Sequence, residues 1–158
     1  MLRCRSLRRC PGASLDELKA LPYHEQITQH FCIQGWSGVA KWGGVAMTTI
    51  LDIVKPLPEA KWVVFYSMAP GSDGGLYYDA HDIAQMDHHL TMLAYRMNDE
   101  PLSYGHGAPL RLRNELQHGF KMVKWLKGIE FVAHFREVGG GYGGYNEDHE
   151  FFGHRQTL

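Results

Sequence analysis

The chain has 158 residues, of which 44% are hydrophobic and 21% charged, and its formal net charge at pH 7 is −1. This length suits a single domain with a buried core, and the near-neutral charge creates no overall field that would favour nucleic acid or an anionic membrane. No apolar run approaches the roughly 20 residues of a membrane-spanning helix. We therefore expect a globular domain, with no nucleic-acid partner and no membrane span in this chain.

The start of the chain is basic and lacks the apolar stretch of a secretory signal. We predict an unstructured tail over residues 1–13, which holds Cys4 and Cys10, and one domain over residues 14–158. As written, the chain is expected in the cytoplasm. A periplasmic location would follow if the true N-terminus lay further upstream.

The domain is predicted to contain short helices, short strands and long loops. Residues 14–17 (SLDE) form a capping box that opens a helix, which Pro22 helps to end. The further predictions are a strand at 25–33, an irregular glycine- and tryptophan-containing loop at 34–46, a helix at 48–54, a strand at 61–66, a loop at 69–76, a helical turn at 83–86, strands at 91–97, 110–113 and 129–135, and a surface loop at 139–144. This pattern indicates an α+β fold with a mixed or antiparallel sheet.

Cys32 lies in an aromatic, glycine-rich segment, residues 30–38 (HFCIQGWSG). A thiolate is a soft metal ligand, and nearby glycines allow a bulky group to approach the backbone. Trp36 and Trp42 could line a pocket. Two alternatives stay open: a buried free cysteine that only packs, or a nucleophile with His30 as its base.

Residues 106–126 are typical of an anion-binding segment. Arg111 and Lys124 flank a turn at Gly119; arginine binds phosphate through two nitrogens, and lysine acts as a compact charge. The alternative is a solvated pair of basic strands that also includes Arg113, Lys121 and Lys127.

The ten histidines show no recognised zinc-ligand spacing, whether in His88-His89 or in His149 with His154. We interpret residues 147–150 (EDHE) as a solvated acidic tail. His81, between Asp79 and Asp82, is an equally weak metal candidate.

Three runs together resemble the catalytic domain of the sulfite oxidase family of molybdenum-cofactor enzymes. They are residues 93–102 (LAYRMNDEPL), 106–111 (HGAPLR) and 121–126 (KMVKWL). The resemblance covers roughly residues 15–137 and implies a sulfite-oxidase-like molybdopterin-binding fold. It also implies that Cys32 is the thiolate ligand of molybdenum. The molybdopterin and its phosphate would be contacted by His106, Arg111, Lys121, Met122, Val123, Lys124 and Ser67.

The segment after Cys32 separates branches of this family. Sulfite oxidases carry arginines four and five residues after the cysteine, whereas this chain has Trp36 and Ser37. The run CIQGWS instead is similar to the CVEAWS loop of bacterial protein-methionine-sulfoxide reductases, with Gln34 in place of the acidic residue. The resemblance therefore favours a sulfoxide over sulfite, with Trp36 shaping the substrate entrance.

The expected function is two-electron oxo transfer on a small sulfoxide- or sulfite-like substrate by a molybdopterin-dependent oxidoreductase. Electrons would come from or go to a separate haem- or quinone-linked protein, because the chain has no Cys-x-x-Cys-His haem motif. Only 31 residues precede Cys32, fewer than the family normally has. A second hypothesis is therefore a truncated, non-catalytic domain acting as a subunit or interaction module. A zinc- or thiol-dependent hydrolase is a third.

Overall fold

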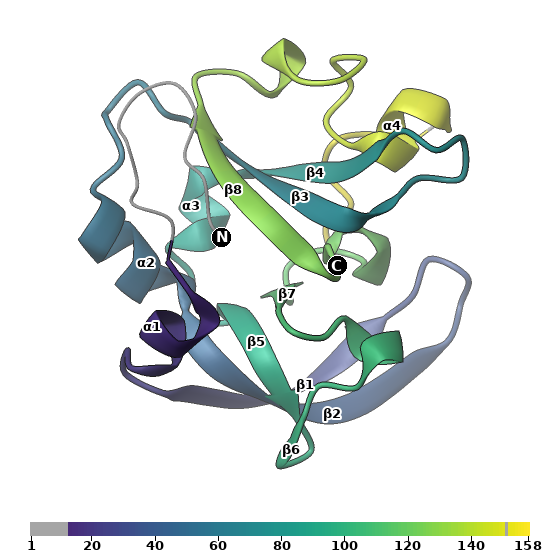
Figure 1. Ribbon diagram of the computed structural model, residues 1–158. Helices are drawn as coiled ribbons and strands as arrows, with labels where there is room; N and C mark the ends of the chain where they lie inside the picture. The colour runs from purple at the N-terminus through teal and green to yellow at the C-terminus, as the bar shows by residue number, and fades with distance from the viewer. Residues whose placement is uncertain (1–12, 151) are drawn as a thin grey trace.

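The computed structural model describes residues 13–150 and 152–158, and their strands form two antiparallel sheets that face each other (Figure 1). In chain order the elements are α1 (Leu15–Lys19), β1 (His24–Phe31), β2 (Ser37–Ala46), α2 (Met47–Val54), β3 (Trp62–Pro70), β4 (Leu76–Asp82), α3 (Ile83–Met86), β5 (Thr91–Met97), β6 (Glu100–Pro101), η1 (Tyr104–His106), β7 (Arg111–Asn114), η2 (Gly119–Lys121), β8 (Leu126–Val132), η3 (Phe135–Glu137) and α4 (Tyr145–His149). The predicted basic tail at 1–13 lies outside the described residues except for Ala13.

The first sheet has the strand order β1-β2-β5-β6, and β7 also pairs with β5. The second sheet has the order β4-β3-β8. Every pairing between these described strands is antiparallel. The predicted α+β fold with short helices is confirmed, and its sheets are antiparallel rather than mixed.

The predicted loop at residues 34–46 is wrong, because Ser37–Ala46 form the long strand β2 at the centre of the first sheet. The glycines of this strand mark a close approach between backbones. A Cβ on Gly44 would lie 2.0 Å from the carbonyl oxygen of Leu93 on β5. The β2–β5 register also shifts between Gly43 and Gly44, a β-bulge that tightens the crossing.

Two other strands differ from the prediction. The predicted loop at 69–76 is shorter, and Leu76 begins the unpredicted strand β4. Asp79 and His81 made this segment look polar, yet both side chains are buried. The last strand begins at Leu126 rather than at residue 129, and ends at Val132.

The helix predictions were closer. Ser14 caps α1 with both bonds of the capping box, and α2 ends where Lys55 adopts a left-handed conformation, φ 48°. Helix α3 and strand β5 have the predicted bounds. Among the described residues, no helix is long and apolar enough to cross a membrane.

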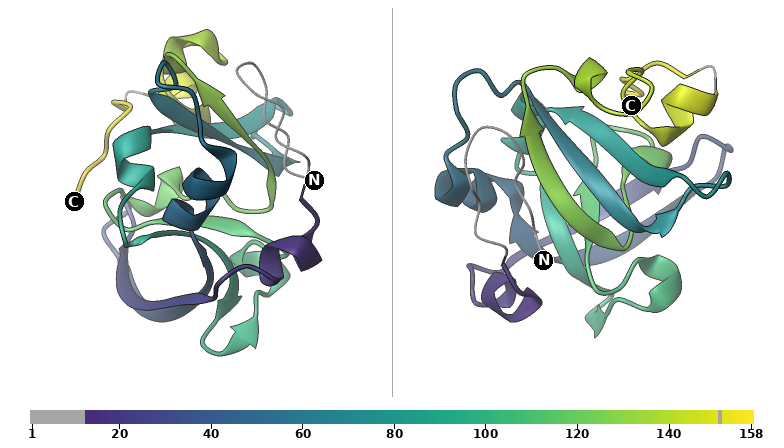
Figure 2. Two further views of the ribbon diagram at one scale, coloured as in Figure 1. Left: turned by 90° about the vertical axis from the view of Figure 1, so that its left-hand side faces the viewer. Right: turned by 45° about the horizontal axis from the view of Figure 1, so that its top comes forward.

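The main core lies between the sheets and draws on both of them. Val45, Leu93 and Leu112 come from the first sheet, and Val63 and Phe65 come from the second. Helices α1 and α2 lie on one side of the molecule (Figure 1). The β1–β2 and β3–β4 hairpins both extend toward the opposite side, as the right-hand view of Figure 2 also shows.

Candidate functional site

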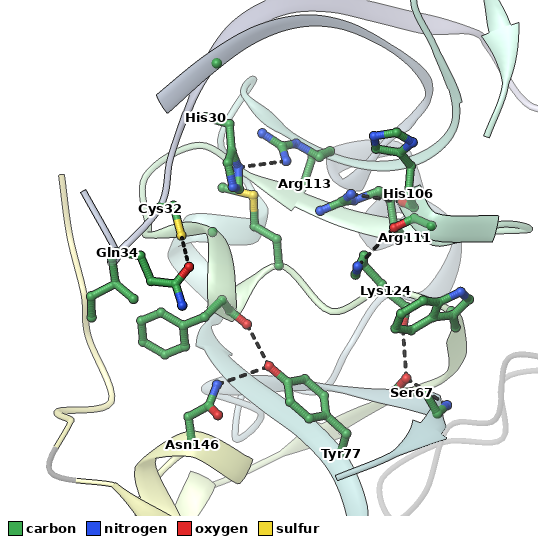
Figure 3. A pocket seen from close by; sticks show the side chains of 18 of the residues that line it. His30, Cys32, Gln34, Ser67, Tyr77, His106, Arg111, Arg113, Lys124 and Asn146 are labelled. Atoms are coloured by element: carbon green, nitrogen blue, oxygen red, sulfur yellow. Dashed lines mark hydrogen bonds between the residues drawn. The ribbon is translucent and has the colours of Figure 1, made fainter. Parts of the chain in front are cut away.

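A pocket of about 820 Å³ opens where the two sheets and the C-terminal segment meet. Side chains from both hairpins, from η1 and β7, and from η2 and α4 line it (Figure 3). The lining residues that bear on its chemistry are His30, Cys32, Gln34, Trp36, Trp42, Ser67, Tyr77, His106, Arg111, Arg113, Phe120, Met122, Lys124, Tyr145 and Asn146. The pocket therefore brings together residues far apart in the sequence.

Cys32 lies in the turn between β1 and β2, and its half-buried side chain lines the pocket. Its backbone N–H donates to Trp36 O at 2.9 Å, and Gly35 N–H donates back to Cys32 O at 3.0 Å. Gly35 has φ 89°, a conformation that favours glycine. The turn is thus closed by its own backbone. The Cys32 Sγ lies 3.9 Å from Gln34 Oε1, and Trp36 is 56% exposed at the pocket rim.

Two buried arginines project from β7 into the pocket. Arg111 and Arg113 are two residues apart on a strand, so they share a face. Their guanidinium groups lie 4.9 and 4.2 Å from the ring centroid of Trp42. Arg111 Nη1 donates to His106 O at 2.9 Å, whereas its buried Nε has no hydrogen-bond partner. Arg113 is held by Glu115 through two hydrogen bonds of 2.8 Å.

The pocket has an excess of positive charge. Arg111, Arg113 and Lys124 line it, and no carboxylate does among the lining residues of the described chain. Burial and the neighbouring Arg113 lower the pKa of Arg111, and burial and Arg111 lower the pKa of Lys124. Burial, followed by Arg113 and Arg111, lowers the pKa of His30 to about 4, so its ring is neutral at pH 7. An anion entering this pocket would relieve the repulsion among these groups.

Three other predicted residues lie around the same cations. Lys124 Nζ donates to Gly105 O at 3.1 Å and sits 4.4 Å from the Trp125 ring. Ser67 Oγ donates to Lys124 O at 2.9 Å, which ties β3 to this segment. His106 is exposed at the pocket rim, with Nδ1 2.7 Å from Ser103 Oγ.

The predicted residues 121–123 divide between pocket and core. Met122 lines the pocket although it is 2% exposed. Val123 belongs to the main core, and only its backbone is available, where its carbonyl accepts from Leu112 N–H at 2.9 Å. Lys121 points away from the pocket, and its ammonium forms ion pairs with Asp79 and Glu147.

The interpretation of residues 147–150 as a solvated tail is wrong for Glu147, which is 3% exposed and pairs with Lys121. The attraction of a buried lysine, which the sequence does not show, holds this carboxylate inside. Within the described chain, no three His, Cys, Asp or Glu side chains are grouped closely enough to hold a metal ion.

Several lining residues were not predicted. Arg113 could have been found, because it follows Arg111 at the two-residue spacing of a strand face. Tyr77, Phe120, Tyr145 and Asn146 carried no such signal. Tyr77, Tyr145 and Asn146 reach the pocket only through the pairing of β3 with β4 and the return of α4 to that sheet, whereas Phe120 lies on η2, within the predicted segment 106–126.

Comparison with known proteins gives a consistent result. Residues 7–138 match the model of the family described as "Oxidoreductase molybdopterin binding domain". The chain is 37% identical, over 139 residues, to the catalytic subunit of a protein-methionine-sulfoxide reductase from Xanthomonas axonopodis pv. citri, covering 81% of this chain and 43% of that protein. It is 36% identical, over 135 residues, to a protein from Azospira oryzae provisionally named protein-methionine-sulfoxide reductase subunit YedZ1, covering 85% of this chain and 47% of the relative.

The chain thus spans a little under half the length of these relatives. Among solved structures, it is similar to the sulfane dehydrogenase SoxCD from Paracoccus pantotrophus, with a TM-score of 0.68 and 20% sequence identity. That match covers 82% of this chain and 38% of the other. At this identity the likeness concerns the fold, and it agrees with the sulfite-oxidase-like expectation.

Proposed function

Because the chain belongs to the oxidoreductase molybdopterin-binding domain family, we propose that its pocket binds molybdopterin with molybdenum attached to Cys32. We further propose that the holoprotein transfers an oxygen atom, with two electrons, to or from a small sulfur-containing substrate. The observation that carries this proposal is the presence, in a single pocket, of one thiol and three cations, of which Glu115 balances only Arg113.

The chemistry of the pocket suits a phosphorylated cofactor. Arg111 is 6% exposed, and its Nε lacks a hydrogen-bond partner. A buried donor without a partner costs free energy that a phosphate oxygen would recover. Arg111 and Lys124 remain without a carboxylate partner while Glu115 balances Arg113, and this excess of positive charge favours an anionic group over a neutral one.

The proposed roles follow from these positions. Arg111, Lys124 and His106 would hold the phosphate and pterin, with the backbone of Met122 and Val123 beside them and Ser67 keeping Lys124 in place. Lys121 would not contact the cofactor with its ammonium, because that group forms ion pairs with two carboxylates; it would act only indirectly, from behind the pocket wall. Cys32 would supply a thiolate to the metal from a turn that its own backbone hydrogen bonds hold.

When bound, the cofactor would supply the two-electron redox change and the oxo group; the protein would position it and exclude water. Trp36 and Gln34 lie next to Cys32 on the pocket wall and would contact the substrate. Neither carries a positive charge, so this part of the wall favours a neutral sulfoxide over sulfite. The names of the relatives, protein-methionine-sulfoxide reductases, support the same choice.

A separate haem- or quinone-linked protein is the proposed electron partner. The exposed rim at Trp36 and His106 leaves the pocket open toward solvent. Such a partner could approach there without a change of fold.

The proposal is tested by producing the chain in a host that makes molybdenum cofactor and measuring molybdenum and pterin in the purified protein. We expect close to one of each per chain. Cys32→Ser should keep most of the pterin, because the cation group is intact, but should lose or weakly hold the metal. The loaded protein is then assayed with a methionine sulfoxide and with sulfite.

Arg136→Met, at an exposed position outside the pocket, is the matched control and should load as the wild type does. A folded sample with neither molybdenum nor pterin would contradict the proposal. It would favour the alternative, a non-catalytic domain that serves as a subunit or interaction module.

A further inference from the structure

A buried group of three charges lies behind the pocket wall, and the proposed function gives no role to its two carboxylates. Asp79 on β4, Lys121 on η2 and Glu147 on α4 are 1%, 0% and 3% exposed. Lys121 Nζ lies 2.6 Å from Asp79 Oδ1 and donates a hydrogen bond to Glu147 Oε1. We call these three residues the buried triad. Two carboxylates thus surround one ammonium in the protein interior.

The two carboxyl groups also lie against the same backbone. A Cβ on Gly144 would meet Glu147 Oε2 at 2.3 Å and Asp79 Cγ at 3.2 Å. Asp79 Oδ2 and Glu147 Oε2 are buried and have no hydrogen-bond partner. Two neighbouring carboxylates thus face one cation, so that either of them alone could balance the charge of Lys121.

The other groups around the triad do not supply that balance. His81 is 1% exposed, and its Nε2 lies 2.9 Å from Lys121 O; its other nitrogen faces Asn114. Burial, followed by Lys121, lowers the pKa of His81 to about 3, so the ring is neutral. Tyr77 is also neutral, since burial and Asp79 raise its pKa. In agreement with the geometry, burial raises the pKa of Asp79, and Glu147 raises it further against the opposing effect of Lys121.

The same side of β4 fixes the backbone of η2. Tyr77, Asp79 and His81 alternate along the strand and therefore share a face. Tyr77 Oη donates to Phe120 O at 2.9 Å, and His81 Nε2 reaches Lys121 O at 2.9 Å. Asn146 Nδ2 donates to Tyr77 Oη at 3.1 Å, which joins α4 to this arrangement (Figure 3).

The segment held in this way leads directly into the pocket. Met122 and Lys124 follow η2 and line the pocket. Between them, Val123 O accepts from Leu112 N–H, next to Arg111 on β7. Displacement of η2 would therefore move one pocket cation and the backbone beside another.

We propose that Asp79 and Glu147 are positioning residues, either of which suffices as the counter-charge of Lys121, and that they thereby fix residues 119–124 at the wall of the cation-lined pocket. Glu147 lies beyond residues 7–138, the part that matches the family model. The fixing of the segment stands on the triad itself, while its consequence for cofactor retention rests on the proposed function.

The test is amide hydrogen–deuterium exchange of Asp79→Asn, Glu147→Gln and the double variant, followed in peptides that cover residues 119–124. Each single variant keeps one carboxylate for Lys121, so we expect exchange within about threefold of the wild type. The double variant leaves a buried ammonium without a counter-charge, and exchange there should rise at least about tenfold. Strand β5 is the internal reference and should change far less.

Three results would overturn the proposal. One is a double variant that exchanges like the single ones. Another is a single variant in which exchange at 119–124 already rises as much as in the double variant, because one carboxylate alone would then hold the segment. The third is an equal rise in 119–124 and β5, which would mean general destabilisation.

If the double variant does not fold, Gly144→Ala replaces it, because the new methyl group must displace the Glu147 carboxylate. Exchange should again rise at 119–124, whereas Gly153→Ala, which meets only ordinary contacts at 3.8 Å, should leave it unchanged. No local rise in Gly144→Ala would also contradict the proposal.

A second readout uses inorganic pyrophosphate, titrated against the tryptophan fluorescence of the same proteins. We expect affinity to fall at least about tenfold in the double variant and little in the single ones. If exchange at 119–124 rises in the double variant but its pyrophosphate affinity is unchanged, the claim that the buried triad supports anion binding in the pocket is wrong. Absence of binding to the wild type would count against the proposed function, and the exchange data would still decide the positioning claim.

Discussion

Arg111 is a buried cation whose charge the fold leaves short of an anionic partner. In the part of the chain that the structure describes, its one hydrogen bond within the protein goes to the carbonyl of His106. Its neighbour Arg113, in contrast, has Glu115. A buried cation without an anionic partner destabilises the folded protein unless a ligand supplies the opposite charge. Arg111 is therefore the most informative single residue for testing the pocket.

Replacement of Arg111 by Met should weaken pyrophosphate binding by roughly 10- to 100-fold, because a charge-assisted hydrogen bond contributes about 1.5–3 kcal/mol. The unfolding free energy should stay the same or rise, since a buried cation is lost. Titration followed by tryptophan fluorescence measures the first, and urea unfolding the second. Arg136→Met should change neither, and equal affinities in Arg111→Met and wild type would exclude Arg111 from the anion site.

His81 makes stability depend on pH in a defined direction. Its folded pKa is about 3, below the ordinary value of 6.5, so between these values the unfolded state binds the proton and the folded state does not. Its contribution is present above pH 6.5 and is lost as pH falls toward 3, by about 1.4 kcal/mol per pH unit.

His81→Gln should therefore flatten the loss of stability between pH 6.5 and 4, although it is less stable at pH 7. Urea unfolding at several pH values measures the slope. His89→Gln, at an exposed position, serves as the control and should keep the wild-type slope. A His81→Gln slope equal to that of the wild type would show that this ring is not the source.

At the scale of single elements, η2 packs so closely on β1 that a Cβ on its first residue, Gly119, would have to displace the His30 ring. A Cβ on Gly119 would lie 2.0 Å from His30 Cε1. His30 in turn faces Arg113, with its Nδ1 3.1 Å from Nη1. The absence of one methyl group thus allows a hairpin strand and a short helical turn to meet beside the cations.

Gly119→Ala should destabilise the protein by about 1–3 kcal/mol, the usual cost of overpacking. It should also weaken pyrophosphate binding, because the His30 ring is pushed toward Arg113. Urea unfolding and the fluorescence titration measure these effects. Gly38, which pairs with His30 across the hairpin and has open space at its Cβ position, gives the matched control Gly38→Ala. Similar stability of the two variants would contradict the packing argument.

Elements with local signals were predictable, and those fixed by distant contacts were not. The capping box at Ser14 and the apolar segment 91–97 gave correct elements because neighbours in sequence determine them. The glycines of β2 suggested a loop. The feature that requires them is the close approach of the β5 backbone, which lies some fifty residues away in the sequence. Strand β4 was hidden because Asp79 is polar in sequence but buried beside Lys121. The same limit explains why Cys32 and Arg111 could be singled out, whereas Asn146 could not.

At the scale of the whole molecule, the pocket is formed between the two sheets and α4 and does not belong to any one of them. Its lining runs from residue 30 to residue 146 and includes both sheets and α4. A ligand in the pocket would contact residues that separate only when the whole domain unfolds. Binding should then stabilise the complete fold, not a local loop.

Saturating pyrophosphate should raise the melting temperature of the wild-type chain. At a pyrophosphate concentration about one hundred times Kd, binding should add about 2.7 kcal/mol to the free energy of unfolding. The increase should be largely lost in Arg111→Met and retained in Arg136→Met. Scanning calorimetry at several pyrophosphate concentrations measures it. An increase of the same size in all three proteins would indicate general salt effects instead of a site.

The return of α4 to the pocket wall bears on how the protein matures. Because Tyr145 and Asn146 complete the wall that Cys32 begins, a chain emerging from the ribosome cannot form the site until residues 145 and 146 are available. If the pocket takes up a cofactor as proposed, loading would follow the folding of this segment, and until then the cations would face one another without a ligand. Under the proposed function, the repulsion between Arg111 and its neighbours Arg113 and Lys124 is therefore relieved only after the whole wall has been assembled.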